Sequence, residues 1–171
     1  MNVSQHLAEL GLALPPVAPP VGSYQPVVRL GCWGDLVFTA GQLPLADGQL
    51  LATGVVGEGG LTTADAAACA RLCALNALAA AAGAAGGIDR LTGIVKLTVF
   101  VASVTSPAFT GQAEVANGAS DLLVEIFGPA GCHARSAVGV AALPLGAPVE
   151  VDLIAQVKTS PQQIRDSYPL K

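Results

Sequence analysis

The sequence predicts an α+β fold with a single mixed β-sheet and two helices packed on one face. Its apolar segments follow the order strand, strand, helix, strand, helix, strand, strand, judged by whether apolar residues recur every second or every third to fourth position. The length of 171 residues is typical of one compact domain with a substantial core. Because two helices cover only one face of the sheet, we expect further copies of the chain to cover the other.

The composition argues against a membrane protein and against a protein that binds nucleic acid. Hydrophobic residues make up 52% of the chain, but no run of about eighteen apolar residues is free of Gly, Pro or charge. The opening MNVSQHLAELG lacks the basic flank and continuous apolar core of a secretory signal, so we expect a cytoplasmic protein. The formal charge of −4, with eight scattered Lys and Arg residues, offers no footprint for a phosphate backbone.

The first third of the chain is predicted to hold a short helix and a β-hairpin. Ser4 is expected to cap a helix at residues 5–10, and a proline-rich connector follows it. Strands are expected at 27–30 and 36–40, joined as an antiparallel pair. The Asp-Gly dipeptide at 47–48 predicts a tight turn after them.

A long helix is predicted next. Thr62 or Thr63 is expected to cap it, with Asp65 favourably placed in its first turn against the helix dipole. The glycines at 83–87 are expected to end it. Its apolar residues recur at spacings of three or four and predict a core-facing stripe of Ala68, Leu72, Leu75 and Leu78.

A nearly continuous apolar run predicts a buried strand at 94–101, with Lys96 as its one charged residue. Lys96 is expected to be an ammonium in solvent at a sheet edge, with a catalytic role as the less favoured alternative. A second helix is predicted from Ser-Pro at 106–107 to residue 127, or from a start nearer Glu114 because glycines weaken its first half.

Two final strands are predicted at 136–140 and 149–157, on either side of a Leu-Pro-Leu-Gly-Ala-Pro turn. We predict that they pair as an antiparallel hairpin. Each run carries one charged residue that its apolar surroundings do not explain, Arg135 and Glu150. The hairpin would bring the two to one side of a sheet edge, where they could bind a carboxylate substrate and activate water beside it.

The cysteines and histidines do not predict a metal site. Cys69 and Cys73 share one face of the long helix, but zinc needs two more ligands and the only histidines are His6 and His133. We therefore expect buried free thiols in the core. Cys132 beside His133 is a poor nucleophile and base pair, because neighbours in a strand point to opposite faces.

Seven segments of the chain form a pattern in a fixed order: GSYQPVVRLG, LVFTAGQLPL, ARLCALNALAA, VKLTVFVAS, NGASDLLVEIFG, HARSAVGV and VEVDLIAQV. Together they resemble the Rid family (RidA/YjgF, also called endoribonuclease L-PSP), and the resemblance covers roughly residues 7–157. The long leader LAELGLALPPVAPP and the wording of NGASDLLVEIFG are similar to those of a less-characterised subgroup.

This resemblance implies a chorismate-mutase-like (YjgF-like) fold in a homotrimer with clefts between neighbouring subunits. One Rid-like domain would span residues 1–157, including a leader at 1–26, and a tail would follow at 158–171. Members of the best-known type hydrolyse enamines and imines to 2-keto acids and ammonia. Their reaction uses no metal or organic cofactor, because an iminium carbon is already electrophilic.

The resemblance also implies roles for individual residues. Arg135 matches the arginine of the family's Ala-Arg-Ser motif and would hold the substrate carboxylate. Glu150 matches the acid of the later strand and would position or deprotonate the attacking water. Tyr24 matches the family's Gly-x-Tyr motif and would shape the pocket, while Gly41 and Asn117 are expected to line it.

Two departures from the well-known deaminases leave the substrate open. Ala40 stands where they commonly carry Ser, and Ala137 where they carry Cys. A trimer that binds small carboxylates without turnover is therefore one alternative, and an endoribonuclease is a weaker one. Arg135 and Glu150 could also form a structural ion pair at a trimer interface. His133 would either assist proton transfer or lie at the cleft rim without a catalytic task.

Overall fold

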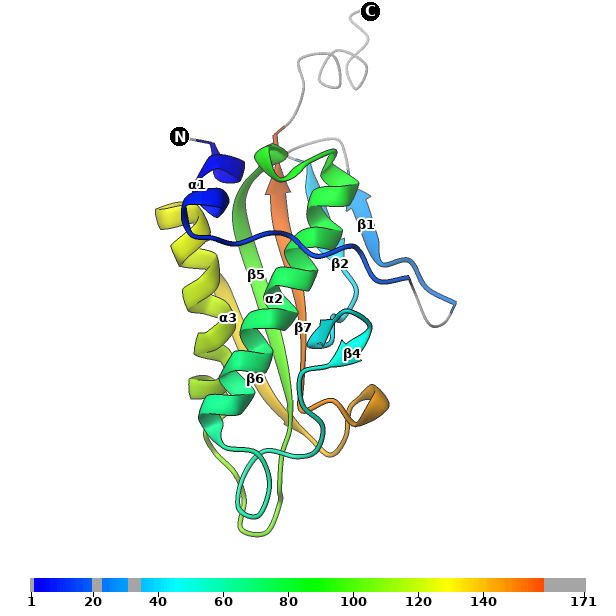
Figure 1. The fold of residues 1–171 in the computed structure, drawn as a ribbon, viewed down its shortest axis with the longest axis vertical. Helices are drawn as coiled ribbons and strands as arrows, with labels where there is room; N and C mark the ends of the chain where they lie inside the picture. Colours follow the sequence, from blue (N-terminus) through cyan, green and yellow to red (C-terminus); the bar gives the residue numbers. More distant parts are fainter. Residues whose placement is uncertain (1, 20–22, 31–34, 159–171) are drawn as a thin grey trace, which may run out of the picture.

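The structure is a computed structural model that describes residues 2–19, 23–30 and 35–158. A five-stranded sheet in the order β1-β2-β7-β5-β6 carries two long helices, α2 and α3, on one face (Figure 1). This confirms the predicted mixed sheet with helices on one side. Cys32 and the tail beyond residue 158 lie outside the described residues. The elements are α1 (Val3–Glu9), β1 (Val27–Leu30), β2 (Leu36–Thr39), β3 (Leu45–Ala46), β4 (Gln49–Leu50), α2 (Thr63–Ala85), β5 (Leu91–Ala102), α3 (Gln112–Phe127), β6 (Ala134–Val140) and β7 (Val149–Val157).

The predicted hairpin of the last two strands is wrong. Strand β5 lies between them, parallel to β6 and antiparallel to β7. At its end the backbone N–H of Ser103 donates to Val140 O (3.1 Å), and that of Ala102 donates to Pro148 O (2.9 Å). The connection at 141–148 is long enough to arch over this end. The twelve-residue strand pairs with β7 from Leu91 to Val101 and with β6 from Lys96 to Ala102.

The register of β5 decides which face each site residue takes. Leu97 is fully buried under the helices, whereas Lys96 and Phe100 point to the open face. Arg135 is the register partner of Leu97, and Glu150 is the register partner of Phe100. Because register partners share a face, Arg135 lies on the helix side of the sheet and Glu150 on the open side.

Helix α2 forms the centre of the core. Thr62 caps it by accepting the backbone N–H of Asp65 (3.1 Å), and Gly86 ends it in the left-handed conformation with φ 85°. Among the described residues, α2 is the one helix with the length and apolar composition needed to cross a membrane. However, 61% of its most apolar stretch is buried inside the fold. Its many alanines let it approach the sheet closely, as a core helix does.

The starts of α1 and α3 differ from the predicted ones. Asn2, not Ser4, caps α1: its side chain accepts the N–H of Gln5 (2.9 Å), and the Gln5 side chain accepts the N–H of Asn2 (3.3 Å). Ser4 instead binds Asp89 through its backbone and its hydroxyl, both at 2.8 Å, and so ties α1 to the segment before β5. Helix α3 begins at Gln112, between the two predicted starts.

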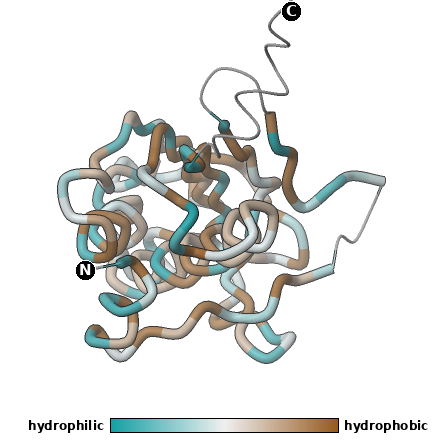
Figure 2. Tube along the Cα trace, turned by 90° about the horizontal axis from the view of Figure 1, so that it is seen from above, coloured by the Kyte–Doolittle hydropathy of each residue, from teal (hydrophilic) through white to brown (hydrophobic). Residues whose placement is uncertain are grey.

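The apolar core lies between the sheet and the two long helices, and Figure 2 shows brown apolar segments running through the middle of the molecule. Cys69 and Cys73 belong to this core as free, buried thiols, which confirms the prediction. Burial is the largest cause that raises the pKa of both thiols, so neither is a reactive thiolate. Cys132 is exposed.

Candidate functional site

The predicted site residues fall into two separate groups. Tyr24, Gly41 and Glu150 line one hollow on the surface. Arg135 and Asn117 form a hydrogen-bonded cluster where β6 meets α3. The first group is called the Glu150 hollow and the second the Arg135 cluster.

The Glu150 hollow has a volume of about 290 Å³. Tyr24 forms one wall with 44% of its surface exposed, and Leu43 and Pro144 add apolar walls that the sequence did not predict. Ala40 also lines the hollow, so the hydroxyl that well-known family members carry at this position is missing from the wall. The hollow therefore combines one carboxylate with a mostly apolar lining.

Gly41 makes room for the carboxylate of Glu150. A Cβ atom at position 41 would overlap the Glu150 side chain, so only glycine lets the carboxylate lie against the backbone here. The next residue fixes this approach, because Gln42 and Val151 exchange two backbone hydrogen bonds of 2.8 and 3.0 Å. Gly41 thus acts by its lack of a side chain, a role that the sequence could only match to the family pattern.

The environment of Glu150 favours its protonated form. Burial of the half-buried side chain raises its pKa first, and the nearby carboxylate of Asp152 raises it further. In the part of the chain that the structure describes, Glu150 has no ion-pair partner. A carboxylate with a raised pKa in a hollow is suited to accept a proton from water.

The Arg135 cluster holds the guanidinium in one orientation. Nη1 donates to Asn117 Oδ1 (2.9 Å) and to Ser120 Oγ (3.0 Å), and Nη2 donates to the backbone oxygen of Ala113 (3.3 Å). All three acceptors belong to α3. Among the described residues, acceptors engage three of the five guanidinium N–H groups. The Nε–H and one Nη2–H therefore remain for a ligand. Two N–H groups on a planar fork match the two oxygens of a carboxylate.

Asn117 and Ser120 were not equally predictable. Asn117 was expected as a lining residue from the family pattern, and the structure places it directly on Arg135. Ser120 was missed. It lies three positions after Asn117 on the same helix, so the two share a face, and that spacing was the signal that could have found it.

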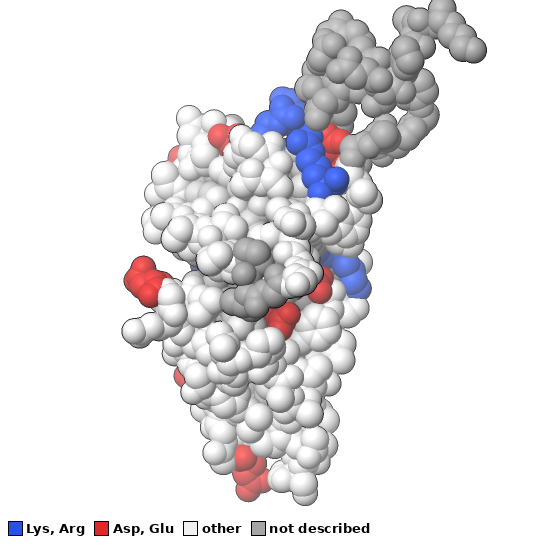
Figure 3. All heavy atoms as spheres, turned by 90° about the vertical axis from the view of Figure 1, so that its right-hand side faces the viewer, with Lys and Arg blue, Asp and Glu red and all other residues white. Residues whose placement is uncertain are grey.

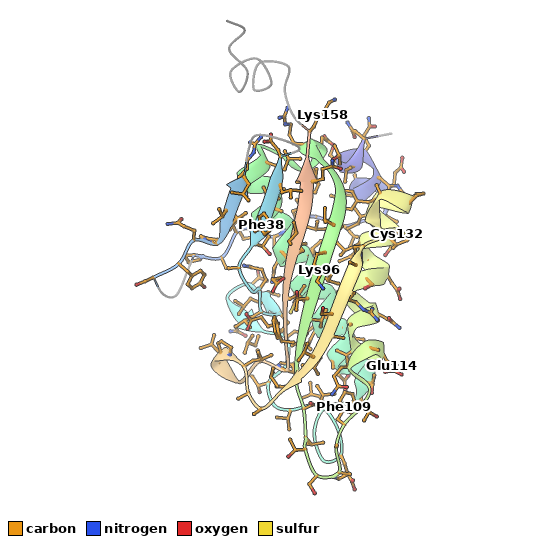
Figure 4. All side chains as sticks on the ribbon, turned by 180° about the vertical axis from the view of Figure 1, so that it is seen from behind. Phe38, Lys96, Phe109, Glu114, Cys132 and Lys158 are labelled. Carbon is orange, nitrogen blue, oxygen red and sulfur yellow. The ribbon has the colours of Figure 1, made fainter. Side chains whose placement is uncertain are left out.

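Lys96 does not belong to either group. Its Nζ donates to Ser136 Oγ (2.6 Å) on the open face of the sheet. Burial raises the pKa of Asp152, and a hydrogen bond with Thr98 and the charge of Lys96 oppose part of that rise. Figure 4 shows Lys96 and Phe38 on this face, seen from behind. The expectation of an edge position is wrong because β5 is an inner strand, flanked by β6 and β7.

The two groups cannot work together within one chain. Arg135 and Glu150 lie on opposite faces, two strands apart across the sheet and three positions apart along it. Their Cα atoms are therefore separated by about 14 Å before the side chains diverge. The prediction that one hairpin brings them to one side is wrong, and the Arg135 cluster and the Glu150 hollow are separate within the chain.

Possible metal ligands do not cluster in the part of the chain that the structure describes. Among the described residues, no group of three or more His, Cys, Asp or Glu side chains could hold a metal ion. Figure 3 shows that most of the described surface on one face is uncharged, with Lys and Arg near its upper end and in a smaller patch at mid-height, and acidic side chains in separate patches. This distribution suits a small ligand bound by a few polar groups.

Comparisons with known proteins agree with this architecture. The family described as "YjgF/chorismate_mutase-like, putative endoribonuclease" matches residues 4–157. Protein TCP17 of Trypanosoma cruzi is 46% identical over 157 residues, covering 91% of this chain and 94% of that protein.

Solved structures give the same result. Atu1372 of Agrobacterium tumefaciens, of unknown function, is 40% identical with a TM-score of 0.80, covering 91% of this chain and 92% of that one. E. coli TdcF with bound serine is 28% identical with a TM-score of 0.57, covering 85% and 94%. The chain therefore belongs to the YjgF/chorismate mutase-like family.

Proposed function

We propose that the chain forms a homotrimer in which the Arg135 cluster of one subunit meets the Glu150 hollow of its neighbour, and that this shared site hydrolyses small imines. The observation that carries the proposal is the division of the site. One half holds a fixed guanidinium with two N–H groups left for a ligand. The other half holds a carboxylate with a raised pKa in a hollow.

Opposite placement of the halves favours a ring of subunits. When one surface of a copy binds a different surface of the next, rotation can close the assembly into a ring. The open sheet face offers apolar side chains for such contacts, including Val138 with 43% of its surface exposed and the register pair Phe38 and Ile154. Trimers of the family, with their intersubunit clefts, are the closed form that we propose.

The chemistry follows from the two groups. Arg135 binds the carboxylate of the substrate and so places its C=N carbon in the cleft. Glu150 accepts a proton from a water molecule, whose oxygen bonds to that carbon while the C=N electron pair moves to nitrogen. Glu150 returns its proton to the nitrogen, giving a carbinolamine. The nitrogen then takes up the hydroxyl proton, the C–N bond breaks as the oxygen forms the C=O bond, and ammonia and a 2-keto acid are left. Water is the only co-reactant, and an enamine enters the same route after tautomerising to the imine.

A second candidate is a trimer that binds small carboxylates without turnover. Ala40 supports it, because the hollow lacks the hydroxyl that the well-known deaminases have there. The serine bound to TdcF is a small carboxylate on a relative of this chain and fits either candidate. An endoribonuclease is less favoured, because the chain carries a net charge of −4.

Ammonia release tests the leading candidate. 2-Aminoacrylate should be generated in the assay by a pyridoxal-phosphate enzyme, and added protein should increase ammonia release above the spontaneous rate. The Arg135→Ala variant should not. Calorimetry with pyruvate separates the alternatives. Pyruvate binding without faster ammonia release would support the binder. The absence of both pyruvate binding and faster ammonia release would overturn the proposal.

A further inference from the structure

We propose that His133 is a positioning residue that acts through Ser120 to orient the Arg135 guanidinium. The consequence for ligand binding rests on the proposed function, but the hydrogen-bonded chain itself does not. His133 lies half-buried just before β6, and Ser120 lies on α3 between it and Arg135.

Three consecutive hydrogen bonds connect these residues. Arg135 Nη1 lies 3.0 Å from Ser120 Oγ, and Ser120 Oγ lies 3.1 Å from His133 Nε2. On the other side of the ring, His133 Nδ1 lies 2.6 Å from the backbone oxygen of Gly131. Both ring nitrogens of His133 are therefore engaged, and neither points to Cys132.

With a neutral His133, the chemistry of the groups fixes the direction of every bond. Arg135 can only donate, and the backbone oxygen of Gly131 can only accept. His133 Nδ1 must therefore carry a proton, so in the neutral imidazole Nε2 is an acceptor. The Ser120 hydroxyl gives its one hydrogen to Nε2 and turns a lone pair toward Arg135.

This direction explains why His133 matters to a residue that it does not touch. Without an acceptor at Nε2, the Ser120 hydroxyl is free to rotate, and its hydrogen can point toward the guanidinium that it should hold. Donation to Nε2 also polarises the hydroxyl oxygen and strengthens it as an acceptor. Asn117 and Ala113 keep their own bonds to Arg135, so losing the Ser120 bond would loosen the guanidinium without releasing it.

A pair of amide substitutions separates this role from a purely structural one. In His133→Gln, the amide oxygen can reach the position of Nε2 and accept from Ser120, while the bond to Gly131 is lost. In His133→Asn, the shorter amide can donate to Gly131 from the position of Nδ1, while the bond to Ser120 is lost. The two variants thus keep opposite halves of the histidine's bonding.

The measurement that needs no ligand is nitrogen NMR of the Arg135 side chain in the full-length protein, which reports rotation of the guanidinium about its Cζ–Nε bond. Wild type and His133→Gln should show slow rotation, and His133→Asn and Ser120→Ala faster rotation. Pyruvate should bind the latter two about two- to tenfold more weakly, the range for one intramolecular hydrogen bond. KM for an imine substrate should rise more than kcat falls.

The double variant Ser120→Ala/His133→Asn should be no worse than Ser120→Ala alone, because His133 has no other route to Arg135. Two outcomes would overturn the proposal by showing that His133 serves only the turn at Gly131. One is additive effects of the two substitutions on guanidinium rotation and pyruvate affinity. The other is wild-type rotation and affinity in His133→Asn together with impaired values in His133→Gln. If wild type binds no pyruvate, the proposed function fails while the rotation rates still decide the role of His133.

Discussion

Arg135 and Glu150 project from opposite faces of one β-sheet, Arg135 toward α3 and Glu150 toward the open side. Their strands are separated by β5, so the two side chains cannot form an ion pair within a chain. The ion pairs among the described residues lie elsewhere: His6 with Glu9, Arg29 with Asp35, and Arg71 with Glu125. A carboxylate ligand that touches both groups must therefore lie between two copies of the chain.

Mixing two inactive variants tests this shared site. Arg135→Ala lacks the guanidinium and Glu150→Ala lacks the carboxylate, so trimers of either variant alone should not hydrolyse imines. In randomly mixed trimers, about a quarter of the clefts combine an intact Arg135 with an intact Glu150. Unfolding and refolding an equimolar mixture should therefore restore activity to about a quarter of the wild-type value.

The control for this experiment is each variant refolded alone, which should stay inactive. Sedimentation equilibrium must show trimers in all three samples. Intact trimers with no recovery of activity after mixing would contradict a site shared between subunits.

The outlines of the fold were predictable from local chemistry. Thr62 is a β-region residue whose hydroxyl accepts a helix N–H, and the Asp-Gly pair at 47–48 adopts the positive φ angles of a tight turn, 51° and 79°. Both signals are contained within a few residues. The same holds for the register of β1 on β2, which a short connection determines.

Strand order was not predictable in this way. The segments at 136–140 and 149–157 look like a hairpin because a turn separates them. Their pairing nevertheless depends on whether a strand from the middle of the chain can lie between them. Strand β5 ends some thirty residues earlier and pairs with both, with β7 along most of its length and with β6 along its second half. The faces of Arg135 and Glu150 depend on that long-range pairing, so local sequence could name the two residues but not place them.

Gly41→Ala tests the close approach of Glu150. The added Cβ would overlap the Glu150 carboxylate, so the side chain must move, and turnover should fall at least tenfold if it supplies the base, a typical scale for a misplaced catalytic group. Steady-state kinetics measure the loss. Gly83→Ala in α2 is the matched control, because its Cβ would make an ordinary 3.7 Å contact with Val17 and helical alanine is favoured. Normal turnover in Gly41→Ala would contradict the role of Glu150.

Arg135→Lys separates charge from geometry. Lysine keeps the positive charge but has three donors and no planar fork, so it cannot serve the three acceptors on α3 and a carboxylate together. Pyruvate affinity by calorimetry should fall about ten- to a hundredfold, the scale of a charge-assisted hydrogen bond, while the assembly stays intact. Arg71→Lys, in an exposed pair with Glu125, should leave affinity unchanged. A dissociated Arg135→Lys protein with unaltered affinity would instead make Arg135 a structural residue.

Glu150→Gln should abolish turnover and yet stabilise the protein at neutral pH. Burial, and then Asp152, raises the pKa of Glu150, so the folded state holds its proton more tightly than the unfolded state. The stability that this proton contributes is fully present below the ordinary value of 4.5 and is lost as the pH rises through the raised pKa. Glutamine has no ionised form, so the variant avoids this loss.

The Tm of Glu150→Gln should therefore exceed that of wild type at pH 7, and the two should converge as the pH approaches 4.5. Glu58→Gln, at an exposed loop position, is the control and should match wild type throughout. Asp152→Asn, in a protein that keeps Glu150, removes the second cause that raises the pKa of Glu150. The pH at which turnover falls on the acidic side should therefore be lower than in wild type. A Tm of Glu150→Gln below that of wild type at pH 7 would mean that ionised Glu150 gains a favourable partner in the assembly, such as the neighbouring subunit's guanidinium.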